Sequence, residues 1–308
     1  MNNEPIQFLT APVPFTRDQV GLLGLSLHAL RNSPRYTQLF HGVWIDNQPD
    51  TAVPAPMWAG FEWANVQVGL SGMLRLHDDL AGTGITAARL YGLPLPRRLT
   101  DNRIHVASAS PDFTLKRRGA VLHRYASLKV ANFCELPLIS VPQLIVELAT
   151  ILTVDELIAV AEAAIGKWHS GPLATPKAIR AEVDSRRYVR NRPLLASVLT
   201  LMRQNVDSPQ ETWLRLWITR QGFPEPTVHP PVQCSNLSYL LHPDLGYPEL
   251  RLAIEYEGDH HRSSDKQFAA DNERIQNLVA QGWTVLRVSK ATNMDHFRQL
   301  LGHHLARA

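Results

Sequence analysis

The chain has 308 residues, of which 44% are hydrophobic, and 31 Lys and Arg residues against 28 Asp and Glu residues give a net charge of +3. This length favours two or three domains over one, and the apolar fraction is that of a globular protein. The mild positive charge permits nucleic acid as a partner without requiring it.

The two cysteines, Cys134 and Cys234, lie far apart and form no CxxC motif. We therefore expect neither a disulfide framework nor a cysteine-based zinc site, and a reduced, cytoplasmic setting fits best. Residues 1–14 lack a basic stretch followed by an apolar one, so we expect no signal peptide. The most apolar region, 136–165, is interrupted by a proline and by acidic residues, so we expect no contact with a membrane.

The first short elements are expected within residues 15–45. Thr16 and Gln19 have the spacing of a capping box and open a short helix, and Ser26 caps a second helix. The stretch 36–45 is rich in aromatic and β-branched residues and contains a glycine, which is typical of a wing strand.

This pattern predicts a winged helix-turn-helix domain at residues 1–50. Such a unit would present three basic side chains to DNA, namely His28, Arg31 and Arg35. The alternative is a small packing domain whose arginines are only solvated.

Residues 51–205 predict a middle region of mixed α/β character. Strands are expected at 104–107 and 121–123, on either side of a basic turn at 116–118, and a capped amphipathic helix at 154–167. A run of arginines follows and suits either a phosphate-binding patch or a solvated helix face: Arg186, Arg187, Arg190 and Arg192. The region has no phosphate-binding glycine motif, so nucleotide binding has no support.

Residues 206–308 predict a third domain with the order helix, strand, strand, helix, strand. Its first helix opens at Ser208, and Glu211 stands three residues after this cap, which is again the spacing of a capping box. Two strands are expected at 237–245 and 250–257, joined by a four-residue turn.

Acidic residues gather on one side of this expected pair of strands. Strand alternation turns the apolar residues of the second strand to a core, and Glu255 and Glu257 to the other face. A symmetric turn would place Asp244 opposite Ala253, on the face of the two glutamates. Clustered carboxylates repel one another unless they are protonated or bind a cation, and hard oxygen ligands suit Mg²⁺ or Mn²⁺. The alternative is a solvated sheet face with ordinary surface acids.

Histidines and arginines follow the acidic strand. Gly258 lets the chain turn, and an imidazole from His260 or His261 beside the acids could act as a general acid or base; we favour His261. Arg274 on the next helix and Arg287 on the final strand are candidates to hold a phosphate or to balance the acids.

These motifs carry a family resemblance across about the last third of the chain. They are, in order, Asp244, the segment 254–258, His261, Asp271 with Arg274, and the segment 282–288. Together they resemble the Vsr-like nuclease domains, which are similar to the very-short-patch-repair endonuclease and belong to the PD-(D/E)XK superfamily. The resemblance implies a restriction-endonuclease-like mixed sheet flanked by helices, and a metal-dependent enzyme that cleaves DNA strands.

The resemblance also implies a role for each acidic residue. Asp244 and Glu255 would bind the metal, Glu257 would bind it or orient water, and His261 would transfer a proton. Glu211 matches an acid that is often found on the first helix of the family, although the capping box explains it equally well.

One departure from the superfamily concerns its lysine, which is replaced here by Glu257. Either its role moves to His261, Lys266 or Arg287, or hydrolysis is lost. Vsr-like members also lack this lysine, which favours the first option.

The front of the chain resembles a second family. The segments 15–45, with His41-Gly42-Val43-Trp44, and 86–94 look like AbiEi-type antitoxins of toxin–antitoxin and phage-defence systems. Those proteins join a winged helix to a second α/β region and typically repress their own operon. The resemblance implies DNA as a partner, together with a partner protein of such a system.

The sequence as a whole predicts an α/β multi-domain protein. The leading hypothesis is a Mg²⁺- or Mn²⁺-dependent DNA endonuclease, including a nickase, with Asp244, Glu255, Glu257, His261 and Glu211 as the catalytic set. The alternative is a DNA-binding transcriptional regulator or antitoxin-like protein whose nuclease fold is inactive, and a third option is a nuclease that acts on RNA.

Overall fold

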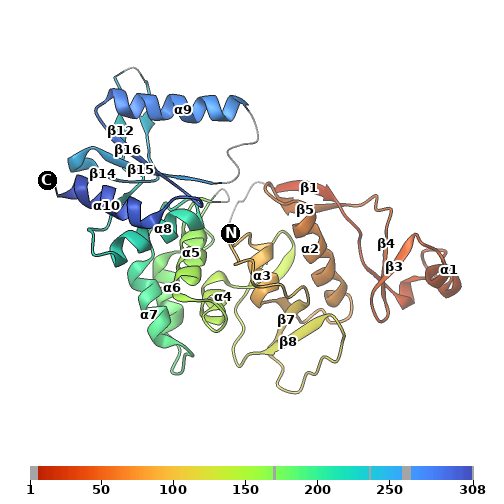
Figure 1. Ribbon diagram of the computed structural model, residues 1–308. Helices are drawn as coiled ribbons and strands as arrows, with labels where there is room; N and C mark the ends of the chain where they lie inside the picture. The colour runs from red at the N-terminus through yellow and green to blue at the C-terminus, as the bar shows by residue number, and fades with distance from the viewer. Residues whose placement is uncertain (1–5, 169–170, 236, 259–264, 307–308) are drawn as a thin grey trace.

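The chain folds into an elongated mixed α/β arrangement. The structure is a computed structural model that describes residues 6–168, 171–235, 237–258 and 265–306. The N-terminal sheet with helix α1 (Leu27–Asn32) lies at one end, helical layers fill the middle, and the sheet that contains β15 (Leu252–Glu257) lies towards the other end (Figure 1). Within the described ranges, every helix is too short or too polar to cross a membrane.

The N-terminal unit is a three-stranded antiparallel sheet with two short helical segments. Its strand order is β2-β4-β3, and its elements are β2 (Phe15–Thr16), η1 (Arg17–Gln19), α1, β3 (Tyr36–Phe40) and β4 (Val43–Asp46). Thr16 and Gln19 form the predicted capping box, but the helix that they open is only a 3₁₀ turn. A small core holds the unit together, made of Phe15, Val20, Leu30 and Trp44. A separate pair of strands, β1 (Ile6–Thr10) and β5 (Ala52–Pro56), connects it to the rest.

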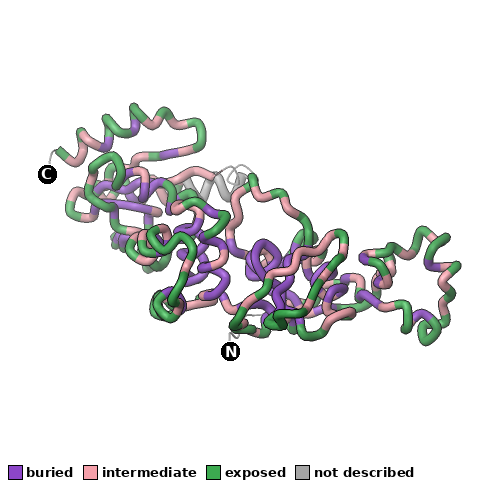
Figure 2. Tube along the Cα trace, turned by 90° about the horizontal axis from the view of Figure 1, so that it is seen from below, coloured by how far each residue is buried: buried purple, intermediate pink, exposed green. Residues whose placement is uncertain are grey.

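The middle region contains a five-stranded sheet and most of the buried side chains (Figure 2). The sheet order is β8-β7-β6-β10-β9, formed by β6 (Ala81–Gly82), β7 (Ile104–Ser108), β8 (Ala120–Arg124), β9 (Val130–Phe133) and β10 (Leu136–Ile139). Strands β7 and β8 are parallel and are joined by the loop 109–119. The helices are α2 (Phe61–Leu74), α3 (Gly84–Leu90), α4 (Val141–Leu148), α5 (Val154–Ile165), α6 (Pro176–Asp184) and α7 (Arg192–Leu201).

The core of the middle region extends into both neighbouring parts of the chain. One cluster of buried side chains includes Val43 on β4 and Leu216 on α8 (Pro209–Arg220). A buried ion pair between Glu162 of α5 and Arg215 of α8 reinforces the second contact, and each of these side chains is only 1% exposed. Thr212 also donates a hydrogen bond to Glu162. The start of α8 is therefore held firmly against the middle region.

The C-terminal part is built on a four-stranded mixed sheet with the order β11-β14-β15-β16. Its other strands are β11 (Thr227–Val228), β14 (Leu245–Tyr247) and β16 (Thr284–Ser289), and β15 runs parallel to β16 and antiparallel to β14. Helices α8 and α10 (Met294–Leu305) pack on one face through Leu214, Ile254 and Leu301. The other face is covered by α9 (Asp265–Ala280), whose Leu278 packs against Ala253.

The pairing around Asp244 differs from the sequence expectation. The expected strand 237–245 is broken, because β13 (Leu240–Leu241) pairs with β12 (Val232–Gln233) and only β14 pairs with β15. Gly246 lies within β14 instead of the turn, where a Cβ atom would come within 2.8 Å of the carbonyl oxygen of Leu252. The turn is instead a 3₁₀ segment, η2 (Pro248–Leu250).

The new register moves Asp244 by two positions. Leu245 pairs with Ile254, so the next position places Asp244 opposite Glu255, where we expected Ala253. A shift of two residues keeps the same face, because side chains alternate with a period of two. The carboxylates of Asp244 and Glu255 therefore come closer together than predicted.

Candidate functional site

Two carboxylates face each other across neighbouring strands. Asp244 stands directly before β14, and its Oδ2 accepts a hydrogen bond from the backbone N–H of Tyr256 at 2.8 Å. Glu255 lies on the inner strand β15 and is only 6% exposed. Arg274 of α9 contacts both acids, through an ion pair with Glu255 and at 3.9 Å from Asp244 Oδ1.

The electrostatics of this pair are unfavourable for two negative charges. Burial, followed by the nearby charge of Asp244, raises the pKa of Glu255 to about 8, although Arg274 opposes this shift. Burial and Glu211 raise the pKa of Asp244 to about 6. In the part of the chain that the structure describes, the buried Oε1 of Glu255 has no hydrogen-bond partner. Buried like charges and an unsatisfied carboxylate oxygen are the conditions that a bound divalent cation relieves.

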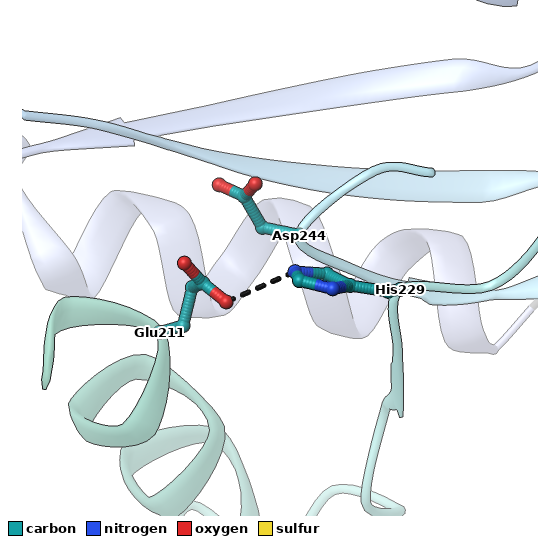
Figure 3. Close-up of side chains that lie close together, drawn as sticks. All are labelled: Glu211, His229 and Asp244. Atoms are coloured by element: carbon teal, nitrogen blue, oxygen red, sulfur yellow. Dashed lines mark hydrogen bonds and ion pairs between the residues drawn. The ribbon is translucent and has the colours of Figure 1, made fainter. Parts of the chain in front are cut away.

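A third acid and a histidine adjoin Asp244. Figure 3 shows Glu211 from the first turn of α8 beside His229 and Asp244, and one potential ligand atom from each lies within 4.8 Å of the others. His229 Nε2 is 3.1 Å from Glu211 Oε2, and the backbone N–H of His229 donates to the carbonyl of Asp244 at 3.1 Å. Burial lowers the pKa of His229, but contacts with Glu211, Asp207 and Asp244 outweigh it and leave this pKa above its usual value.

Glu211 is not explained by helix capping alone. Ser208 Oγ accepts the N–H of Glu211 at 3.1 Å, as a cap does. The carboxylate of Glu211 accepts instead from the N–H of Asp207 at 3.1 Å. Only half of the predicted capping box is therefore formed, and the buried carboxylate of Glu211 also faces His229.

Glu257 lies two residues further along β15, at the edge of a cavity. Its carboxylate forms an ion pair with Arg287 of β16, and Arg287 is the register partner of Glu255. The cavity has a volume of about 240 Å³ and is lined by Arg97, Gln210, Tyr256, Glu257, Gly258 and Lys290. Two cations, Arg97 and Lys290, thus lie beside Glu257.

The structure says less about the remaining residues that the sequence predicted for the site. His260 and His261 lie outside the described residues, as do the side chains of Lys266 and Asp271. Arg31 is exposed on α1, whereas Arg35 forms an ion pair with Asp46 at 2.7 Å. The charge of Arg35 is therefore already partnered.

Two other predicted basic groups have local partners. His28 contacts the side chain of Asn32 at 3.1 Å within α1. From the arginine run, Arg186 forms an ion pair with Glu182 at 2.6 Å, so this part of the run has a structural partner.

Sequence reasoning missed His229, Arg97 and Lys290. His229 follows a strand of two residues and precedes two prolines, so no periodic pattern marks it. Arg97 belongs to the middle region, and it reaches the cavity only because this region packs against the C-terminal part of the chain. Lys290 directly follows β16, and only the parallel pairing of β15 with β16 brings it beside Glu257.

Comparison with known proteins adds little to this geometry. No protein-family model matches the chain, and no curated protein matches it. Among solved structures, the chain is similar to the crystal structure of the Rv2827c protein from Mycobacterium tuberculosis, with 16% sequence identity and a TM-score of 0.38. The similarity covers 61% of this chain and 72% of that chain, and at this distance the likeness carries no functional inference.

Proposed function

We propose that the chain is a metal-dependent DNA endonuclease or nickase of the Vsr-like PD-(D/E)XK type. The observation that carries this proposal is the position of Asp244 opposite Glu255 on adjacent strands. Both carboxyl pKa values are raised, and one buried oxygen of Glu255 has no hydrogen-bond partner among the described residues. An isolated surface acid has none of these properties, and paired buried carboxylates of this kind are suited to hold a cation.

The donor set suits a hard divalent cation. Asp244 and Glu255 would hold Mg²⁺ or Mn²⁺, with Glu211 and His229 beside Asp244. When bound, the ion supplies charge neutralisation at the phosphodiester and lowers the pKa of water.

His229 and Glu257 have roles that their contacts suggest. His229 contacts Glu211 and Asp207 and has a raised pKa, so it can hold a proton near neutral pH. Glu257 stands at the position of the superfamily lysine, so the positive charge of that lysine is missing there. Its carboxylate forms an ion pair with Arg287. We assign the proton-transfer role to His229 or to His261, which was predicted from the sequence.

The cations around the site support a phosphate-bearing substrate. Arg97 and Lys290 line the cavity beside Glu257 and have the chemistry to bind a phosphodiester. Arg274 contacts Glu255, and Arg287 contacts Glu257. We propose that both arginines balance the acidic charge in the free protein and bind phosphate groups when DNA is bound.

The N-terminal unit supports DNA binding at the other end of the molecule. Its small sheet and its two helical segments are compatible with a winged helix, with Arg31 exposed. On this basis we propose DNA as a partner, and from the sequence resemblance alone we propose a partner protein in a defence or toxin–antitoxin setting.

A regulatory function is the second candidate, and one contact favours it. The guanidinium of Arg274 already contacts both Asp244 and Glu255, so a cation of the chain itself neutralises part of their charge. In this reading the fold binds DNA as a regulator or antitoxin-like protein, and the nuclease site is inactive.

A nicking assay separates the two candidates. Purified protein with Mg²⁺ or Mn²⁺ should nick supercoiled plasmid DNA, and Asp244→Ala should lower the rate at least about 100-fold. Glu249→Ala removes an exposed acid from the neighbouring turn and should leave the rate unchanged. If the wild type binds DNA tightly but does not nick it, the regulatory function is supported. If Asp244→Ala nicks DNA as fast as the wild type does, the catalytic site lies elsewhere. Parallel RNA substrates test the third option.

A further inference from the structure

A second candidate binding site is lined by residues entirely different from those of the carboxylate site. It is a cavity of about 410 Å³ between the tip of the β3–β4 hairpin and the loop 109–119. Most of the residues that line it are basic, namely His41, His77, Lys116, Arg117 and Arg118. The described lining contains no Asp or Glu.

Specific contacts hold this basic pocket in shape. The guanidinium of Arg117 donates a hydrogen bond to the carbonyl of His41 at 2.7 Å, which ties the loop to the hairpin tip. Arg124 of β8 donates to the carbonyl of Phe113 at 2.9 Å and 3.0 Å. The ring of His77 packs edge-on against that of Phe113, with centroids 4.9 Å apart. Because three different segments anchor the loop, the pocket is organised before any ligand arrives.

Among the described residues, no acid forms an ion pair with the exposed cations of the pocket. Lys116 and Arg118 are exposed, and no carboxylate of the described residues forms an ion pair with either. In the N-terminal unit, by contrast, Arg35 is paired with Asp46. Three cations, with no acid in the described lining, create a local positive potential that favours an anionic ligand.

We propose that this pocket binds phosphate groups. Lysine and arginine are the donors that phosphate oxygens prefer, and the hydroxyl of Thr114 adds a neutral donor to the lining. The phosphate belongs either to a nucleic-acid backbone that crosses the hairpin tip or to a free phosphorylated molecule. The proposal stands apart from the nuclease activity, because the pocket shares no residue with the carboxylate site.

The test uses the full chain without divalent ions, so that DNA cleavage does not contribute. Binding of a labelled duplex is followed by fluorescence anisotropy over a range of salt concentrations, and binding of inorganic pyrophosphate by calorimetry. The test variant is Lys116→Ala/Arg118→Ala. The matched control is Lys177→Ala/Arg180→Ala, which removes two exposed charges from α6. Thermal unfolding checks that both variants are folded.

For a backbone ligand, the test variant should bind the duplex about tenfold more weakly at moderate salt. Its slope of log affinity against log salt should fall by about 2, whereas the control should match the wild type. For a free ligand, duplex binding stays constant and the test variant alone loses the pyrophosphate signal. If the test variant binds both probes as the wild type does, the proposal is overturned. None of these outcomes depends on Asp244, so nicking activity and this pocket are tested separately.

Discussion

Two contacts between a carboxylate and an arginine, at opposite ends of the chain, behave in opposite ways. In the N-terminal sheet, the hydrogen bond from Arg35 outweighs the effect of burial and holds the pKa of Asp46 below its usual value. In the C-terminal sheet, Glu255 also contacts an arginine, yet burial and the charge of Asp244 raise its pKa to about 8. An arginine contact therefore does not distinguish a functional acid from a structural one. Burial next to a like charge, as for Glu255 beside Asp244, is what makes an acid a candidate for a functional site.

The largest effect expected from this contrast is on metal binding. Glu255→Gln should weaken Mn²⁺ binding at least about tenfold, because the amide keeps the shape of the side chain and loses its charge. Asp46→Asn is the matched control and should bind Mn²⁺ as the wild type does. Isothermal calorimetry measures both, and equal affinities in all three proteins would place the ligands elsewhere.

The second effect is on stability as a function of pH. The folded pKa of Glu255 is raised from an ordinary value of 4.5 to about 8. Between these values the folded chain retains a proton that the unfolded chain releases, so the metal-free protein loses stability as pH rises through this window. The melting temperature in the presence of a chelator should fall by several degrees between about pH 5 and pH 8.

Glu255→Gln should flatten this part of the pH profile, since the amide does not titrate. An equally steep decline in the variant would assign the pH dependence to other groups. Saturating Mn²⁺ should oppose the decline in the wild type, because metal binding competes with protons for the same oxygens.

The smallest effect concerns the exposed pair. Asp46→Asn should change the melting temperature by less than about 3 °C, because exposed ion pairs contribute little to folding. A larger loss, measured by thermal unfolding at moderate salt, would mean that Arg35 and Asp46 organise the N-terminal sheet and would weaken the contrast between the two ends.

Local signals in the sequence predicted much of this fold. The capping boxes at Thr16 and Thr153 are formed as expected, because they depend only on residues three apart. The alternation along β15 correctly placed Glu255 and Glu257 on one face, since strand period is a local property. The close approach of Asp244 to Glu255 also followed from this alternation, although the register was wrong by two residues.

The rest depends on contacts between distant segments. The sheet face that carries Glu255 is covered by α9, and Ala253 is buried against Leu278 because of it. His229 reaches Glu211 only through the pairing of β11 with β14 and the docking of α8 on α5. The periodicity of a single segment does not predict such contacts between distant segments. The sequence therefore pointed to the clustered acids and to Arg274 and Arg287, and it missed His229, Arg97 and Lys290.

The most direct test of the central claim, that Asp244 and Glu255 together bind a divalent cation, is diffraction from crystals grown with Mn²⁺. We expect an anomalous scattering peak in contact with both carboxylates, and a guanidinium of Arg274 that has moved away from Glu255. Crystals that show Mn²⁺ bound elsewhere, with Arg274 still joined to both acids, would contradict it.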